Sequence, residues 1–183
     1  NTESWNLLLS SFNQRGLTTS STGTPFTVFF NNGLYEGMTG STVPAGVKIV
    51  AGSSVVWTTS NNNAPIVTIF GEVDGVKFDL QGRAFTNRMV NVSSGGVLRN
   101  FGMYGTENQT SARSYNCALC MFNGSGALIE NGRAVGLRPI NGVDLYGDGG
   151  GIVTKNSSGT FRNNYFRFIT KASGDSSAIG LNY

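Results

Sequence analysis

The chain has 183 residues and a mass of 19.4 kDa, the size of one ordinary domain. Charged residues make up only 13 % of it, and 26 Gly with many Asn, Ser and Thr stand in their place, a composition that disfavours helices and favours strands and turns. The aromatic share of 11 % is enough for a buried core and excludes a disordered chain. No apolar run approaches the roughly 18 residues of a membrane helix, so we expect no membrane insertion. The complete absence of His excludes Ser-His-Asp triads and His-bearing zinc sites.

Lys and Arg are scattered singly along the chain, with no run of three. Together with a net charge of only +3, this distribution predicts no nucleic-acid partner, although a weakly basic surface would accept an acidic glycan. Cys117 and Cys120 form a C-x-x-C pattern, but residues i and i+3 of a strand point to opposite faces. We therefore predict two small apolar core residues and no metal site.

Residues 3–14 are the one segment with helical periodicity. Trp5, Leu8, Leu9 and Phe12 follow an i, i+3, i+4, i+7 pattern, which places one apolar stripe on a short helix. Such a stripe must cover something. A single helix ahead of an all-β chain predicts a lid over the end of a sheet structure.

Beyond Gly16 the chain consists of short β-rich segments separated by Gly, Ser and Asn. The first predicted strands are Thr27–Phe30, Val47–Val50, Val55–Thr58 and Ile66–Phe70. From residue 76 onward the segments repeat, because similar strands start at residues 88, 118, 151 and 178, in steps of 30, 33 and 27 residues. After each of the first three, a small-residue turn leads to a second strand that is followed by Asn.

A β-rich repeat of this length, without an internal helix or hairpin turn, predicts the coils of a parallel solenoid. Stacked coils place equivalent residues about 4.8 Å apart, so the repeat predicts ladders of equivalent side chains. The first is an inward Asn ladder at a bend, made of Asn100, Asn131 and Asn163. The second, one position earlier, is an outward column of alternating charge, made of Asp79, Arg99, Glu130 and Arg162.

Three stretches of the chain resemble the pectate-lyase-like right-handed parallel β-helix superfamily, and within it the glycan-handling appendages of viruses such as phage tailspikes. They are NNGLYEG (31–37) followed by VPAGVKI (43–49), GVKFDLQG (75–82), and GIVTKN (151–156) with FRNNYF (161–166). The resemblance covers about residues 26–183. It is specific for the fold but not for the function, because the superfamily contains lyases, glycosidases, epimerases and inert spikes.

The fold implied is all-β, a single right-handed parallel β-helix of about six coils over residues 26–183, with an incomplete last coil. Residues 1–25 supply an N-terminal capping helix and the loop that leads from it. The resemblance also implies a homotrimer at an extracellular or virion-surface location. The last segment, Ala178–Tyr183, stops in mid-repeat, so we expect another subunit or a continuation of the chain to cover that end.

The resemblance implies a protein that handles a polysaccharide, and two hypotheses stay open. The first is an enzyme, a polysaccharide lyase or glycoside hydrolase, that recognises and depolymerises the glycan. The second is a non-catalytic spike or adhesin that binds a glycan of the host surface. Only an enzyme needs two ionisable groups that converge in an outward groove, since hydrolysis uses paired carboxylates and elimination uses a base.

The densest group of ionisable residues lies between residues 142 and 155. The predicted catalytic residues are Asp144, Asp148 and Lys155, with Glu130, Arg133 and Arg162 as alternatives. The predicted substrate-binding residues are Arg138, Tyr146 and Tyr165, since cations suit acidic sugars and aromatic rings suit apolar sugar faces. The two Asp residues also fit Asx turns beside Gly. The rings of Tyr104, Tyr115, Tyr146 and Tyr165 also fit packing between coils or protomers.

The absence of His excludes the patterns of the polygalacturonase and alginate-epimerase members of the superfamily. A lyase that uses Lys or Arg as its base needs no His, and it could use Ca²⁺ held by Asp side chains. The residues themselves indicate no cofactor and no metal-ligand set.

Overall fold

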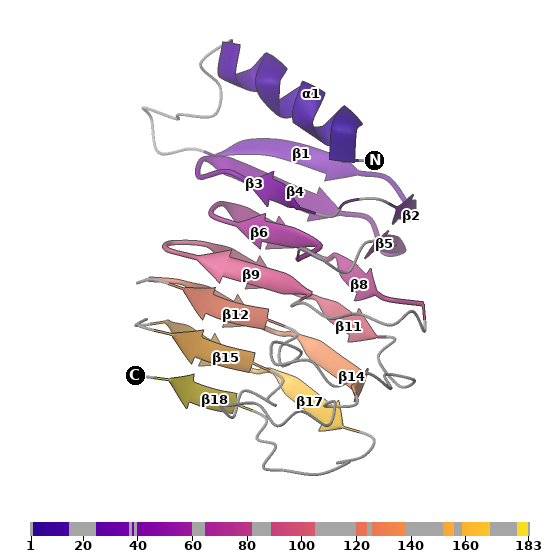
Figure 1. The fold of residues 1–183 in the computed structure, drawn as a ribbon. Coiled ribbons are helices and arrows are strands. Elements are labelled where there is room, and N and C mark those ends of the chain that lie inside the picture. Colours follow the sequence, from indigo (N-terminus) through magenta and orange to yellow (C-terminus); the bar gives the residue numbers. More distant parts are fainter. Residues whose placement is uncertain are drawn as a thin grey trace.

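In the computed structural model, one helix is followed by parallel β-strands that stack in three sheets (Figure 1). The helix, α1, spans Thr2–Gln14 and confirms the helix predicted over residues 3–14. The structure describes residues 2–14, 25–36, 38, 40–59, 65–81, 89–104, 120–123, 126–137, 152–155, 159–168 and 179–182.

Each sheet has six strands within the described part of the chain. Sheet A consists of β1 (Phe26–Phe30), β4 (Val47–Ala51), β7 (Glu72–Asp74), β10 (Val97–Arg99), β13 (Leu128–Glu130) and β16 (Thr160–Arg162). Sheet B consists of β2 (Gly33–Glu36), β5 (Val55–Thr58), β8 (Lys77–Asp79), β11 (Gly102–Tyr104), β14 (Arg133–Leu137) and β17 (Tyr165–Phe168). Sheet C consists of β3 (Ser41–Val43), β6 (Val67–Ile69), β9 (Val90–Ser93), β12 (Cys120–Asn123), β15 (Ile152–Lys155) and β18 (Ile179–Asn182).

The chain visits the three sheets in rotation, because each strand pairs in parallel with the strand three places later. Three consecutive strands, one in each sheet, therefore make one round, and the next round lies about 4.8 Å away along the stack. This arrangement confirms the predicted all-β fold with parallel strands and one short helix.

The register confirms most of the predicted repeat. Leu98 pairs with Ile129, and Ile129 pairs with Phe161, as the positions before the repeated Asn predict. Cys120, however, pairs with Ile152, a step of 32 residues, so the predicted step of 33 was wrong by one. The small residues that begin these segments do not fix a register; the alternation of inward and outward side chains does.

One hydrophobic cluster collects the inward side chains of all three sheets. Trp57 and Phe78 are completely buried, and their rings meet edge to face at a centroid distance of 5.9 Å. The Phe30 ring lies 5.3 Å from that of Trp57 and extends the aromatic stack to the first round. Because alternate residues of each strand fill this core, the others form rows on the outer faces of the sheets.

The helix α1 covers the N-terminal end of the stack, beside β1 (Figure 1). Trp5 holds it there: the side chain is 4 % exposed, the ring lies 5.9 Å from that of Phe30, and Nε1 donates a hydrogen bond of 2.9 Å to the carbonyl oxygen of Thr42. Leu9 packs against the core, whereas Leu8 is 37 % exposed. The covering face is therefore narrower than the predicted stripe.

We predict that Trp5→Ala lowers the free energy of unfolding by about 3–5 kcal/mol, because it removes a buried ring and leaves a cavity. The matched control Leu7→Ala, at a position that is 67 % exposed, should change it by less than about 0.5 kcal/mol. Urea denaturation followed by circular dichroism measures both. Equal losses for the two variants would contradict the assignment of Trp5 as the anchor of the helix.

The repeated Asn residues lie at the bend from sheet A to sheet B, in the left-handed backbone region. Asn100, Asn131 and Asn163 have φ angles of 52°, 54° and 54°, and Gly75 has a φ of 87° at the equivalent position. This conformation suits Gly and Asn and strains most other residues. In the four rounds from Gly75 onward, the bend takes one left-handed residue, and this need explains the repeated Asn.

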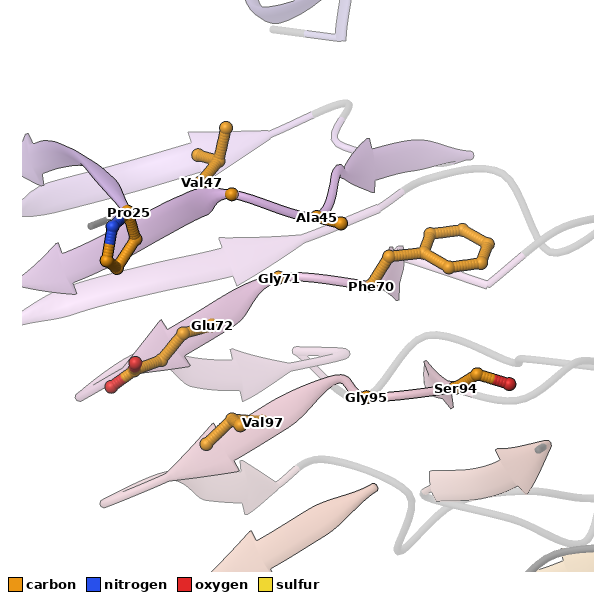
Figure 2. A pocket seen from close by; sticks show the side chains of 10 residues that line it. Pro25, Ala45, Val47, Phe70, Gly71, Glu72, Ser94, Gly95 and Val97 are labelled. Atoms are coloured by element: carbon orange, nitrogen blue, oxygen red, sulfur yellow. The ribbon is translucent and has the colours of Figure 1, made fainter. Parts of the chain in front are cut away.

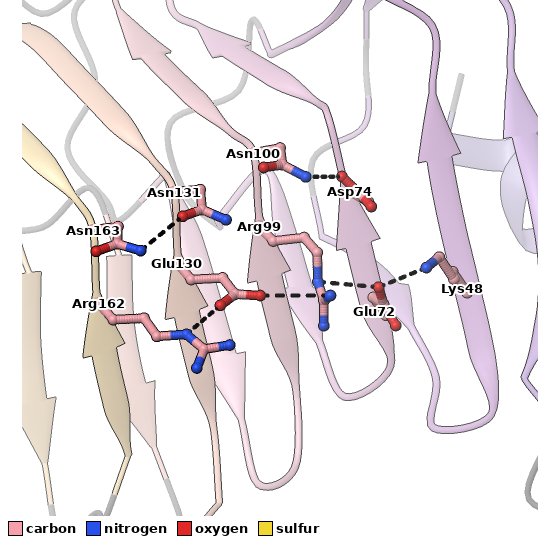
Figure 3. Close-up of polar contacts among 9 residues, drawn as sticks. All are labelled: Lys48, Glu72, Asp74, Arg99, Asn100, Glu130, Asn131, Arg162 and Asn163. Atoms are coloured by element: carbon pink, nitrogen blue, oxygen red, sulfur yellow. Dashed lines mark hydrogen bonds and ion pairs between the residues drawn. The ribbon is translucent and has the colours of Figure 1, made fainter.

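The prediction of an inward Asn ladder was wrong, because the three Asn side chains are exposed. Asn163 Nδ2 donates to Asn131 Oδ1 over 3.3 Å, and Asn100 Nδ2 donates to Asp74 Oδ1 over 2.7 Å (Figure 3). A side chain on a left-handed residue at an outer bend points to solvent, so these amides link the rounds from outside.

We predict that Asn131→Ala lowers the free energy of unfolding by about 1 kcal/mol, since Ala pays the left-handed penalty that Asn largely avoids. Asn131→Gly should cost less, because Gly adopts the same φ without strain. Both variants lose the amide contact to Asn163, so equal destabilisation in urea titrations would assign the effect to that contact and contradict the backbone explanation.

Candidate functional site

The predicted catalytic group divides between described and undescribed residues. Asp144, Asp148, Arg138 and Tyr146 lie outside the described residues, as do Tyr115 and Cys117. Lys155 ends β15, where its backbone pairs with that of Asn123 on one side and Asn182 on the other. These assignments therefore stay predictions. The other four predicted site residues fall into two pairs, one on the outer face of sheet A and one on that of sheet B.

Five side chains of alternating charge form a charge column along the outer face of sheet A (Figure 3). In order along the stack they are Lys48, Glu72, Arg99, Glu130 and Arg162. Lys48 Nζ lies 2.9 Å and Arg99 Nε 3.2 Å from Glu72 Oε1. The column confirms the predicted neighbours Arg99, Glu130 and Arg162.

The assignment of Asp79 to this column was wrong. Asp79 belongs to β8 of sheet B, where it pairs with Tyr104, and its Oδ1 accepts a hydrogen bond of 2.7 Å from the backbone N–H of Gln81. In the earlier rounds the acidic members of sheet A are Glu72 and Asp74, both on β7. The prediction placed Asp79 one round before Arg99, a step of 20 residues, whereas the register pairs Arg99 with Asp74, a step of 25 residues.

Glu130 and Arg162, two of the alternative catalytic residues, are held together in the charge column. Glu130 Oε2 lies 2.5 Å from Arg162 Nε, and Glu130 Oε1 lies 3.5 Å from Arg99 Nη1. The Glu130 side chain is only 6 % exposed. Both oxygens of this carboxylate are thus bound to guanidinium groups, so proton transfer by Glu130 would require the pairs to open. The observed geometry gives both residues a role in joining rounds.

We predict that Glu130→Gln lowers the free energy of unfolding by about 1–2 kcal/mol, because two guanidinium groups lose their shared anion while both keep partial access to water. Lys48→Gln is the matched control at the end of the column, where Arg99 still neutralises Glu72, and it should cost under about 1 kcal/mol. Urea titrations at low and high NaCl test this. An equal loss in the free energy of unfolding for both variants would contradict the role of Glu130 in the charge column. So would a difference between the two losses that does not change with the NaCl concentration.

Arg133 and Tyr165, the second pair of predicted site residues, meet on the outer face of sheet B. They are register partners on β14 and β17, and the guanidinium carbon of Arg133 lies 5.7 Å from the centre of the Tyr165 ring. Tyr165 is 53 % exposed. Among the described residues, no carboxylate pairs with the Arg133 guanidinium. An accessible cation stacked on an accessible ring is therefore the main chemical feature of this face.

Two more side chains extend this pair into a basic–aromatic row of Lys77, Tyr104, Arg133 and Tyr165. Gly102 pairs with Lys77 on one side and Arg133 on the other. A Cβ atom on Gly102 would lie only 2.6–3.0 Å from atoms of the Tyr104 ring, so this ring lies over Gly102, in line with the two cations. The row thus alternates cation and ring over four strands.

The sequence contains a signal for this row that the prediction missed. Lys77, Gly102, Arg133 and Tyr165 each stand two residues after the left-handed residue of their round. Once the bend is known, residues at that distance must share one row on sheet B. Tyr165 and Arg133 were chosen for their chemistry alone, and Lys77 was not chosen.

A shallow groove of about 420 Å³ follows the turns that lead from sheet C to sheet A (Figure 2). Its lining includes Phe70, Glu72, Ser94 and Val97. Phe70 is 42 % exposed, but its ring and the Glu72 carboxylate point to opposite sides of Gly71. Because Glu72 is already bound to Lys48 and Arg99, the described residues of the groove bring together no pair of reactive groups.

Among the described residues, no three or more Asp, Glu, Cys or His side chains cluster in a way that would hold a metal ion. The described helix is also too short and too polar to cross a bilayer. No protein-family model, no curated protein and no solved structure matches the chain. Any assignment of function therefore depends on the chemistry of the outer faces.

Proposed function

We propose that the three sheets close around their shared core as a single right-handed parallel β-helix of the pectate-lyase-like type. Support comes from the pairing of each strand with the third strand after it, and from the single core that all three sheets share. Connections between parallel strands are right-handed in nearly all proteins. The helix α1 fits the capping element that such a fold needs at its first round.

We propose that this β-helix is an extracellular or virion-surface protein that binds a polysaccharide. The observation that carries the proposal is the contact of Arg133 with the half-exposed ring of Tyr165 on the outer face of sheet B. An aromatic ring offers its face to the C–H side of a sugar, and a guanidinium donates to hydroxyl or carboxylate oxygens. The rigid stack holds both groups in place before a ligand arrives, which lowers the entropy cost of binding.

Four of the described carboxylates are held by other groups, which favours binding over cleavage on sheets A and B. Glu72 and Glu130 are fixed in the charge column, Asp74 accepts from Asn100, and Asp79 accepts from the backbone of Gln81. A glycosidase needs one carboxylate that is free to donate a proton and a second on the other side of the bond. Depolymerisation would therefore depend on Asp144, Asp148 and Lys155, and it stays a second hypothesis. The homotrimer stays a prediction about the oligomeric state.

We predict that the protein is retarded in native gels that contain a polysaccharide it recognises, without shortening the polymer or creating new reducing or unsaturated ends. Tyr165→Ala should reduce this retardation about tenfold, the effect of losing one stacking ring and its bound cation. Phe29→Ala is the matched control, because Phe29 is an aromatic residue on sheet A that is 73 % exposed.

A panel of acidic and neutral polysaccharides should be used. Equal effects of Tyr165→Ala and Phe29→Ala would contradict sheet B as the binding face. No retardation by any polymer would contradict the proposed function. New unsaturated ends would establish a lyase, and new reducing ends without unsaturation a hydrolase.

A further inference from the structure

The basic–aromatic row has a spacing that a linear polymer can match. Lys77 and Arg133 stand two strands apart on sheet B, which corresponds to about 10 Å across the strands. A sugar residue in an extended polysaccharide is about as long as one strand spacing, about 4.8 Å. A chain that runs across the strands would therefore place one sugar over each strand, and the strand positions of the two cations would lie two sugars apart.

The position between the two cations is aromatic. The Tyr104 ring lies over Gly102, which pairs with both Lys77 and Arg133. Because Gly has no side chain, the ring can lie against the strand and offer its face outward. The Tyr165 ring repeats this pattern one strand beyond Arg133. An aromatic ring binds a sugar through apolar contact, so the sugar that lies over each ring needs no charged group.

A negative group at every sugar would meet repulsion in this row. Asp79 is the register partner of Tyr104 and faces outward two residues after Lys77, on the same side of β8. Its Oδ1 accepts from the backbone N–H of Gln81, so this negative charge lies on the outer face of β8, the strand that carries Lys77. Lys77 uses one of its three donors on the carbonyl oxygen of Ser53, over 2.9 Å, and so retains donors for an anion. The guanidinium of Arg133 has five donors.

We propose that the ligand is a linear polysaccharide with an acidic group on alternate sugar residues, which lies across the strands of sheet B along Lys77, Tyr104, Arg133 and Tyr165. The inference rests on the proposed function and adds the substrate class. The two cations bind carboxylate or sulfate groups of alternate sugars, and the two rings stack on the neutral sugars between them. The positive charges of the row favour an acidic polysaccharide. The alternation of cation and ring along the row favours a polysaccharide that carries its acidic group on every second sugar.

The experiment measures dissociation constants by isothermal titration calorimetry at low NaCl. The probes are hyaluronan oligosaccharides, which carry a carboxylate on every second sugar, the same oligosaccharides with the carboxyl groups reduced to alcohols, and oligogalacturonate, which carries a carboxylate on every sugar. We expect hyaluronan to bind tightest, with an affinity that falls as NaCl is added. Reduction of its carboxyl groups should weaken binding at least about tenfold.

Variants then locate the ligand. Arg133→Gln and Lys77→Gln should each weaken hyaluronan binding about tenfold. Gly102→Ala should weaken it as well, because the new methyl group displaces the Tyr104 ring. Lys48→Gln removes the same charge from sheet A and should change the affinity by less than about twofold. Thermal melting confirms that each variant folds, and Arg133→Lys, which keeps the charge, should retain more binding than Arg133→Gln.

Each outcome has one meaning. Equal affinity for native and carboxyl-reduced hyaluronan, or tighter binding of oligogalacturonate, would overturn the alternating acidic ligand and leave polysaccharide binding intact. Equal losses for Lys48→Gln and Arg133→Gln would overturn the row on sheet B. Binding of a neutral polysaccharide alone would overturn the inference, whereas no binding of any polysaccharide would overturn the proposed function with it.

Discussion

The structure depends on one constraint, the parallel pairing of each strand with the strand one round later. This pairing satisfies the backbone hydrogen-bonding groups between rounds and fixes which residues stand above one another. Inward positions then share one core, where Trp57 lies on Phe78. Outward positions become rows whose chemistry repeats every strand spacing. A single change of register would exchange the two sets.

The two outer rows show what this constraint can build. On sheet A, opposite charges alternate and neutralise one another, so that the carboxylate of Glu130 is almost buried between two guanidinium groups. On sheet B, cations alternate with rings, and no described carboxylate pairs with Arg133. The first row satisfies itself and joins the rounds. In the second row Arg133 and Tyr165 are exposed and Lys77 and Tyr104 are half-buried, and we propose that this row binds a ligand.

Much of the fold could be predicted from the sequence, because the left-handed bends at Asn100, Asn131 and Asn163 leave a visible repeat, and the residues of the strands before them alternate between inward and outward positions. The orientation of that Asn could not, since only the backbone shows that Asn163 turns outward. Asp79 was misplaced because the step between rounds changes along the chain. Tyr165 and Arg133 could be chosen by chemistry, but their contact depends on register, and Lys77 stands out only after the register is known.

If register creates a ligand-binding row on sheet B, as we propose, a bound ligand must lie along that sheet. A titration of the ¹⁵N-labelled protein with a hyaluronan oligosaccharide, followed by the amide chemical shifts, locates the ligand. We expect shifts at Gly102, Arg133 and Tyr165 and none at Lys48 and Arg99 of sheet A. Shifts centred on sheet A or on the groove beside Phe70, or no shifts at all, would contradict this proposal.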